Sequence, residues 1–214
     1  MHVVITGANR GIGAALSAGY AEAGHEVTGT ARGADAAHPL DVTDPASQAD
    51  FAQALGPRAV DLLICNAGVY PDKGHDLETG FDAETWAAAL TTNVTGVFLT
   101  IQSLLPHLAR AEAPKIAIIS SIMASDARAP GGSYAYRASK AAALNLGRNL
   151  AVDLAPRGMA VGIYHPGWVR TEMGGDAADI DVAEARDGLM ARFAALSVET
   201  TGCFEGWDGA PIAF

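Results

Sequence analysis

The sequence has little cysteine, few basic residues and no long uninterrupted apolar run. Its two cysteines, Cys65 and Cys203, are far apart and belong to no C-x-x-C pair, so we expect two reduced thiols and neither a disulfide nor a metal site. The formal net charge of −10 at pH 7 argues against a nucleic-acid partner, because a surface of that sign repels phosphate groups.

The sequence also lacks the usual features of a membrane or exported protein. Its first residues have neither the basic stretch nor the apolar run of a secretory leader, and the apolar runs further along are much shorter than a membrane span. These absences predict a cytoplasmic protein with no membrane partner.

The composition is that of a folded domain. Half of the residues are apolar and 18% are charged, and a chain of 214 residues is long enough to bury a core of its own. The sequence contains no internal repeat and no low-complexity linker. We therefore predict a single domain over residues 1–214.

Short runs rich in β-branched residues alternate with longer stretches rich in alanine and leucine. Strands are predicted at 3–5, 26–30, 38–40, 60–65, 115–120, 159–164 and 201–205. Helices are predicted at 11–23, 83–109 and 134–154, and after Asp181, where Glu184 completes a capping-box pattern. This alternation predicts an α/β fold with a Rossmann-type, doubly wound parallel sheet, whose ligands bind beyond the carboxyl ends of the strands.

A glycine-rich turn, TGANRGIG at 6–13, lies between the first strand and the first helix. Glycines at this spacing let the backbone turn sharply and approach a pyrophosphate, which the N–H groups at the helix start can bind. No Gly-Lys-Ser/Thr follows, so an ATPase is disfavoured. The residues predicted to contact a dinucleotide here are Gly7, Asn9, Arg10, Gly11, Ile12 and Gly13.

The same turn resembles the T-G-x-x-x-G-x-G motif of the short-chain dehydrogenase/reductase family. Further elements similar to those of the family follow in the family's order: Asp41-Val42, Asn66-Ala67-Gly68, Asn93, Ser120-Ser121, Tyr136-x-x-x-Lys140 and Pro166-Gly167-Trp168-Val169-Arg170-Thr171. The resemblance covers almost the whole chain. It implies further cofactor contacts from Asp41, Val42, Asn66, Ala67, Gly68, Tyr136, Lys140, Pro166, Gly167, Val169 and Thr171.

The resemblance also implies a catalytic set of Asn93, Ser121, Tyr136 and Lys140. Tyr136 and Lys140 are four residues apart and therefore share one helix face. A tyrosine that shuttles protons near neutrality needs its pKa lowered from about 10 to about 7, which takes roughly 4 kcal/mol. The Lys140 ammonium and the positive cofactor ring are the expected sources. By resemblance, Ser121 polarises the substrate carbonyl and Asn93 holds a water that links Lys140 to solvent.

Tyr134 competes with Tyr136 for the acid/base role. The usual spacing from Ser121 in the family falls on Tyr134, but Tyr136 is the tyrosine with a lysine four residues further on. The pair Gly131-Gly132 offers a place for two extra residues. We therefore predict that Tyr136 is the catalytic tyrosine.

The end of the second strand distinguishes between the two nicotinamide cofactors. An NAD site usually has an acidic residue there, to hold the ribose 2′-hydroxyl. Here the position is about Ala31, followed by Arg32, and Arg10 lies in the nearby turn. Two cations suit a 2′-phosphate, so NADP(H) is favoured over NAD(H), although Asp35 lies close by.

Segments 132–140, 165–175 and 207–212 look like the sniffer/C-factor-like carbonyl reductase branch of the family. That resemblance implies an NADP(H)-dependent oxidoreductase that reduces a small aldehyde or ketone to an alcohol. Two alternatives remain open: a non-catalytic nucleotide-binding regulatory or signalling protein of the same fold, and an NAD-dependent alcohol dehydrogenase. Family members commonly pair through the helices at 83–109 and 134–154, which implies a homodimer or homotetramer. The segment after Gly175 is short, which predicts an open or small substrate pocket.

Overall fold

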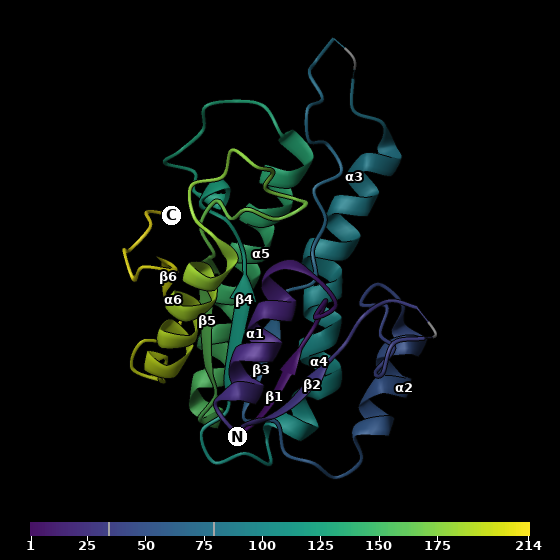
Figure 1. Cartoon of the computed structure of the whole chain (residues 1–214), viewed down its shortest axis with the longest axis vertical. Helices are drawn as coiled ribbons and strands as arrows, with labels where there is room; N and C mark the ends of the chain where they lie inside the picture. Colours follow the sequence, from purple (N-terminus) through teal and green to yellow (C-terminus); the bar gives the residue numbers. More distant parts are fainter. Residues whose placement is uncertain (34, 79) are drawn as a thin grey trace.

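The computed structural model describes residues 1–33, 35–78 and 80–214, and a six-stranded parallel sheet forms its centre (Figure 1). The order across the sheet is β2-β1-β3-β4-β5-β6, so the chain winds outward in both directions from the β1/β3 boundary. The strands are β1 (His2–Ile5), β2 (Glu26–Gly29), β3 (Leu62–Cys65), β4 (Lys115–Ile119), β5 (Ala160–His165) and β6 (Phe204–Gly206). The predicted doubly wound α/β fold is confirmed.

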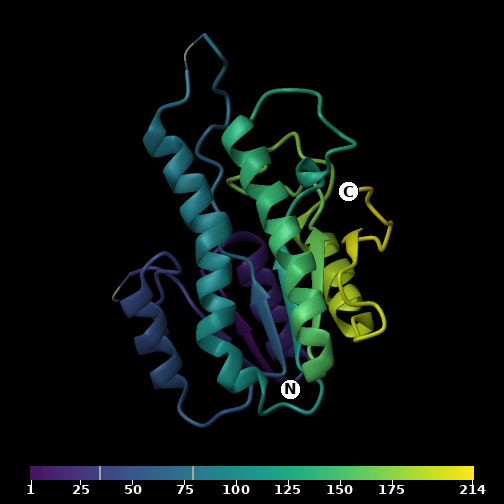
Figure 2. The same ribbon diagram turned by 180° about the vertical axis from the view of Figure 1, so that it is seen from behind.

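Helices cover both faces of the sheet. Helices α1 (Gly11–Glu22) and α6 (Val182–Ala195) lie on the face toward the viewer in Figure 1. Figure 2 shows the other face, covered by α4 (Gly96–Leu108) and α5 (Tyr134–Leu154), with α2 (Pro45–Leu55) beside them. Helix α3 (Ala83–Leu90) continues into α4 through a π-helical turn at Thr91–Thr95.

The two faces of the sheet bury different side chains, as the period of two along a strand requires. In β1, Val3 and Ile5 pack with Leu16 of α1 in one cluster, whereas Val4 packs with Leu104 of α4 in the other. The sheet therefore separates two apolar layers, and the fold has no need of a disulfide. Both cysteines are free thiols.

Helix α2 was not predicted from the sequence. Its start carries clear signals: Pro45 occupies the first turn, and the Asp44 carboxylate accepts a hydrogen bond of 2.9 Å from the Ala46 N–H. Its buried face, however, includes Gln48 along with Phe51 and Leu55, so the apolar period is weak. Gln48 is satisfied internally, because its amide donates to the Thr100 hydroxyl at 2.8 Å.

The predicted strands differ from the structure in extent, and two differ most. The strand expected at 38–40 is reduced to an isolated bridge between Ala31 and Pro39, because the described residues between β2 and α2 form no further ladder. The last strand is Phe204–Gly206 and not 201–205. The helix expected at 83–109 is present but interrupted by the π-helical turn, and the helix at 134–154 is confirmed at both ends.

By length and composition alone, the stretch Ala83–Leu108 is long and apolar enough to cross a membrane. The stretch contains no uninterrupted apolar run that would mark it as a membrane span in the sequence. In the structure its inner face packs against the sheet, with Val97, Ile101, Leu104 and Leu108 inside one of the apolar clusters. This burial is the pattern of a core helix.

Gly147 of α5 allows that helix to approach the sheet closely. The Cβ of an alanine at Gly147 would lie 2.6 Å from Ile163 Cγ1 and 3.0 Å from Ile118 Cδ1. Gly147→Ala is therefore expected to lower the free energy of unfolding by about 1–3 kcal/mol, since overpacking outweighs the roughly 1 kcal/mol that alanine gains in a helix. Urea unfolding measures the change, with Asn149→Ala on the exposed face of α5 as the control. An unchanged or higher stability would contradict this expectation.

Candidate active site

The glycine turn has the geometry that a bound pyrophosphate requires. Gly7 and Gly11 adopt φ values of 66° and 54°, which favour glycine. A Cβ on Gly13 would lie 2.2 Å from the Gly7 carbonyl oxygen, so α1 begins against the backbone of the turn. The first N–H groups of α1, which have no partner within the helix, are therefore available to bind an anion.

Asn66, which follows β3, holds the glycine turn in place. Its side-chain amide donates to the backbone oxygens of Thr6 at 2.9 Å and Gly7 at 3.0 Å. The Thr6 hydroxyl oxygen accepts in return from the N–H groups of Asn66 and Ala67, both at 3.0 Å. These bonds join the ends of β1 and β3 where the sheet changes its direction of winding.

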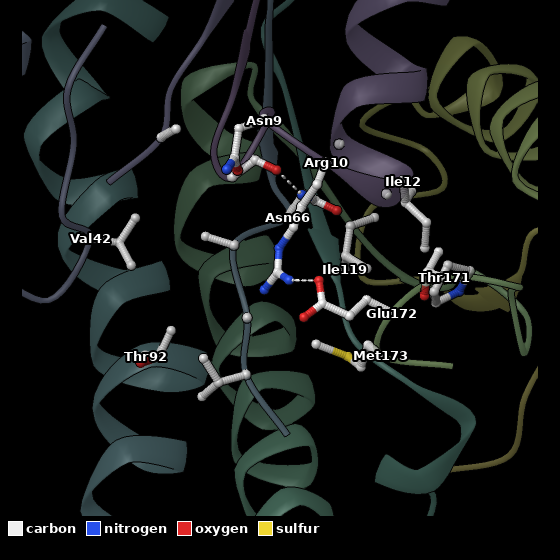
Figure 3. Close-up of a pocket in the computed structure, with 18 of the residues that line it drawn as sticks. Asn9, Arg10, Ile12, Val42, Asn66, Thr92, Ile119, Thr171, Glu172 and Met173 are labelled. Carbon is white, nitrogen blue, oxygen red and sulfur yellow. Dashed lines mark hydrogen bonds and ion pairs between the residues drawn. The ribbon is translucent and has the colours of Figure 1, made fainter. Parts of the chain in front are cut away.

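A cleft of about 810 Å³ opens beyond the carboxyl ends of the strands and includes the glycine turn in its wall (Figure 3). It is lined by every predicted cofactor residue except Gly167 and Val169. The cleft has further lining residues that were not predicted as cofactor contacts: Ala31, Leu40, Thr43, Val69, Thr92, Ile119, Ser120, Arg170, Glu172, Met173 and Val182. Most of them are chain neighbours of predicted residues, so proximity in sequence was the available signal.

The two exceptions, Gly167 and Val169, belong to the loop after β5 and hold it through contacts with Ile180. Val169 is buried and forms a bridge with Ile180, and a Cβ on Gly167 would lie 2.4 Å from Ile180 Cδ1. Thr171, which does line the cleft, donates to the Val169 carbonyl at 3.3 Å and accepts from the Gly174 N–H at 3.1 Å. The loop is thus held in a defined shape at the edge of the cleft.

Asp41 shapes the opposite end of the cleft. Its carboxylate accepts from the Thr43 hydroxyl at 2.7 Å and from the Thr43 N–H at 2.9 Å. These hydrogen bonds lower the pKa of Asp41, and the Arg32 charge adds a smaller effect in the same direction. Because the carboxylate accepts both of these hydrogen bonds from Thr43, Asp41 fixes the turn that borders the cleft.

Arg10 extends across the cleft to Glu172 (Figure 3). Both side chains of this ion pair are exposed, so the pair adds little to stability. Arg10 and Arg32 also line a smaller adjoining hollow of about 450 Å³, together with Lys73. Arg10, Arg32 and Lys73 therefore gather at one side of the cleft, and Glu172 is an acidic partner of Arg10 that the sequence did not reveal.

Tyr136 and Lys140 meet inside the protein on the first turns of α5. The Lys140 ammonium lies 5.6 Å from the Tyr136 ring centroid and donates to the Ile119 carbonyl at 2.9 Å. Both residues line the cleft. Tyr134, in contrast, is 37% exposed and packs edge-on against Phe81. Of the two tyrosines, Tyr136 is the one beside the lysine.

Asn93 is buried in the π-helical turn between α3 and α4. Its side chain donates to the Val69 carbonyl and accepts from the Val69 N–H, both at 2.9 Å, and also donates to the Ser139 hydroxyl. A Cβ on Gly68 would lie 3.2 Å from Asn93 Oδ1 and 3.5 Å from Lys140 Nζ, so the bare glycine separates these two groups. Such π-helical turns are frequent at functional sites.

Ser120 and Ser121 at the end of β4 point in opposite directions, as strand alternation predicts. The Ser120 hydroxyl donates to the Lys140 backbone carbonyl at 3.1 Å. The Ser121 hydroxyl accepts from the Met123 N–H at 3.1 Å, and its interaction with the Tyr136 hydroxyl lowers the pKa of that phenol. Ser121 is therefore the serine that reaches the phenol.

The expected lowering of the Tyr136 pKa is wrong for the protein alone. Burial raises the pKa of Tyr136 above its usual value, and the interaction with Ser121 offsets only part of this effect. The electrostatic effects of the Tyr70 hydroxyl and of the Asp72 carboxylate raise it further. Burial also lowers the pKa of Lys140 to about 8. Tyr136 is thus kept protonated, next to an ammonium that can release its proton not far above neutrality.

Sequence reasoning missed two residues of the loop after β3 that contact Tyr136. The Tyr70 ring stacks on the Tyr136 ring, with centroids 4.1 Å apart and planes at 19°. The Asp72 carboxylate accepts from the N–H groups of Ala135 at 2.9 Å and Tyr136 at 3.2 Å. A Val-Tyr-Pro-Asp segment is typical of a turn, so nothing in the sequence pointed to these contacts.

Comparison with known proteins identifies the family. A family model described as short chain dehydrogenase matches residues 1–180. The C-signal protein of Myxococcus xanthus is 34% identical over 164 residues, which cover 76% of this chain and 97% of that protein. The 3-oxoacyl-acyl-carrier-protein reductase of Escherichia coli is 29% identical over 204 residues, covering 88% of this chain and 80% of that enzyme. The chain belongs to the short-chain dehydrogenase/reductase family and is an oxidoreductase.

The solved structures that are similar to this chain include carbonyl reductases. The NADPH-bound carbonyl reductase from chicken fatty liver superposes with a TM-score of 0.91 at 29% identity and covers 100% of this chain and 98% of its own. The carbonyl reductase Sniffer of D. melanogaster superposes with a TM-score of 0.92 at 26% identity, covering 100% and 99%. The resemblance seen in the sequence is confirmed.

The buried ammonium of Lys140 makes stability depend on pH. The folded chain releases this proton near pH 8, whereas the usual pKa of 10.5 applies to the unfolded chain. Between these values the unfolded state binds more protons, so wild-type stability rises with pH relative to a variant without the lysine. From about pH 7 to about pH 11, the free energy of unfolding of Lys140→Met should therefore fall relative to wild type by about 3 kcal/mol.

Urea unfolding of both proteins across this range measures the difference, in which all other titrations cancel. Stability differences that stay constant with pH would contradict the assignment of a shifted proton to Lys140.

Proposed function

We propose that this oxidoreductase reduces a small aldehyde or ketone to the alcohol with NADPH. The observation that carries the proposal is the buried pair of Tyr136 and Lys140 in the wall of the cleft that the glycine turn borders. Ser121 interacts with the phenol, and Asn93 lies across the bare Gly68 from the ammonium. This arrangement supports a role of Tyr136 as proton donor beside a cleft that holds the cofactor.

The residues of the cleft fit the cofactor. The start of α1 and the glycine turn would hold the pyrophosphate, since Gly13 permits a close approach of the backbone. Arg10 and Arg32 would hold the 2′-phosphate, because guanidinium groups pair with phosphate in a bidentate manner. Thr171 and the loop after β5 would hold the nicotinamide end. The relative from chicken fatty liver is described as NADPH-bound, which supports this choice.

The chemistry of the chain's own residues then follows from their environment. NADPH supplies the hydride when bound. Tyr136 donates its phenolic proton to the carbonyl oxygen as negative charge develops there, and Ser121 donates a hydrogen bond to the same oxygen. Burial favours the neutral phenol, so the donor is loaded before the substrate arrives.

Lys140 and Asn93 restore the donor after each reaction. The ammonium stabilises the phenolate that Tyr136 leaves behind. The pKa of Lys140 is lowered to about 8, which lets this group pass on a proton near neutral pH. The space that Gly68 leaves between Asn93 and Lys140 would hold the water that carries the proton from solvent.

The acid/base assignment is tested by replacing each tyrosine. Tyr136→Phe is expected to reduce turnover about 1000-fold, because the proton donor is lost while the ring and its stacking on Tyr70 are kept. Tyr134→Phe is the matched control and should keep turnover within about twofold. The measurement is NADPH oxidation by absorbance with a panel of aldehydes and ketones.

A reversed result would assign the chemistry to Tyr134. Wild-type protein that binds NADPH but turns over no member of the panel would favour a regulatory nucleotide-binding protein. Faster alcohol oxidation with NAD⁺ would favour an alcohol dehydrogenase.

The cofactor assignment is tested at Arg10. Arg10→Ala is expected to weaken NADPH binding about tenfold and to leave NADH binding nearly unchanged, since only NADPH carries the 2′-phosphate. The dissociation constants are measured by fluorescence titration. Arg58→Ala removes the Arg58–Glu26 surface ion pair and is the matched control. Equal losses for both cofactors would contradict a 2′-phosphate contact.

A further inference from the structure

The first turn of α5 is capped from a distant loop. Ser133 occupies the N-cap position, but it has a left-handed φ of 50° and its hydroxyl bonds to the Tyr70 hydroxyl, not to the helix. The Asp72 carboxylate instead accepts from the N–H groups of Ala135 and Tyr136. First-turn N–H groups have no partner within a helix, so Asp72 supplies what a local N-cap residue normally would.

Asp72 differs from the other aspartates that cap helices in this protein. Asp44, Asp82 and Asp181 are exposed, as is usual for such residues, whereas Asp72 is 0% exposed. A buried carboxylate is unfavourable unless its oxygens are hydrogen-bonded. Here the helix start provides those bonds, and its dipole favours the negative charge.

The backbone, the ring and the hydroxyl of Tyr136 each contact a neighbouring residue. Its N–H is bound by Asp72, its carbonyl accepts from the Ser139 hydroxyl at 2.8 Å, and its ring stacks on Tyr70. Its hydroxyl interacts with Ser121. The contact between this N–H and Asp72 fixes where helix α5 begins, and it thereby fixes the position of the phenol.

Two opposite charges also lie near Tyr136, one beside its ring and one at its backbone N–H. The Lys140 ammonium lies on the same helix, 5.6 Å from the ring centroid, and the Asp72 carboxylate lies on the loop after β3. The uncharged hydroxyls of Tyr70 and Ser121 complete the surroundings. Burial makes the largest contribution to the raised pKa of Tyr136, and the charge of Asp72 acts in the same direction.

We propose that Asp72 is a positioning residue for the reaction, which fixes Tyr136 through its backbone N–H and sets a negative charge against the phenol. The proposal rests on the proposed role of Tyr136 as the proton donor. The carboxylate favours the protonated phenol before the reaction, and Lys140 favours the phenolate after it. The charges of Asp72 and Lys140 therefore act in opposite directions on the pKa of Tyr136, and together they set the pH range over which it donates its proton.

Hydrogen exchange of the wild-type protein tests the positioning without any variant. The N–H groups of Ala135 and Tyr136 should exchange at least about tenfold more slowly than first-turn N–H groups of α6, whose cap Asp181 is exposed. Equally fast exchange at both helix starts would overturn the proposal. This measurement needs no turnover, so it stands even if the proposed function fails.

Three variants separate the charge from the cap. Asp72→Asn keeps the outline and one acceptor oxygen, and should move the basic limb of the kcat profile to lower pH by about one unit. Asp72→Glu keeps the charge but displaces the helix start. It should therefore leave the limb in place while kcat falls about tenfold, with KM for NADPH unchanged. Asp181→Asn, the control, should change neither quantity.

The outcomes decide as follows. A shifted limb for Asp72→Asn together with an unshifted limb for Asp72→Glu supports the proposal. A wild-type limb for Asp72→Asn overturns it, because Asp72 would then act only as a cap. If Asp72→Asn does not fold, a limb displaced in Asp72→Glu overturns the proposal, and an unmoved limb with slow exchange at Ala135 and Tyr136 supports it.

Discussion

The segment that leaves β3, residues 66–72, is the constraint on which the rest of the site depends. Its first residue holds the glycine turn through hydrogen bonds to Thr6 and Gly7. Val69 binds both hydrogen-bonding atoms of the Asn93 amide, and Asp72 caps α5. One short segment therefore fixes the glycine turn, the π-helical turn and helix α5 relative to one another. Parallel strands bring their carboxyl ends to one edge, and this segment makes the ends into a site.

The sequence was informative where local chemistry decides the structure. The glycine turn follows from backbone conformation at Gly7 and Gly11, and the bounds of α5 follow from its apolar period. It was silent where a side chain acts far along the chain. Asp72 caps a helix 63 residues away, and Glu172 meets Arg10 across 162 residues. No local pattern encodes either contact. Helix α2 was not predicted for a related reason. Its buried Gln48 side chain is satisfied by a hydrogen bond to Thr100 on another helix, which no local pattern reveals.

An acidic chain can still hold an anionic cofactor, because the relevant fields are local. The net charge of −10 is spread over the molecule, and charges further than about 8 Å away are largely screened at physiological salt. Within the cleft the α1 N-terminus, Arg10 and Arg32 present positive potential at short range. Net charge therefore excludes extended polyanions such as nucleic acid more strongly than it excludes one dinucleotide.

The placement of Tyr136, the proposed proton donor, on α5 couples the core to the site. Helix α5 runs from the cleft to the far end of the sheet, and Gly147 seats it against Ile163 and Ile118 (Figure 2). A catalytic hydroxyl must be held to a fraction of an ångström to act in the transition state. A long helix packed at one end and capped by Asp72 at the other meets that demand, whereas the same tyrosine on a loop would not. Packing that looks purely structural at Gly147 thus contributes to the position of Tyr136.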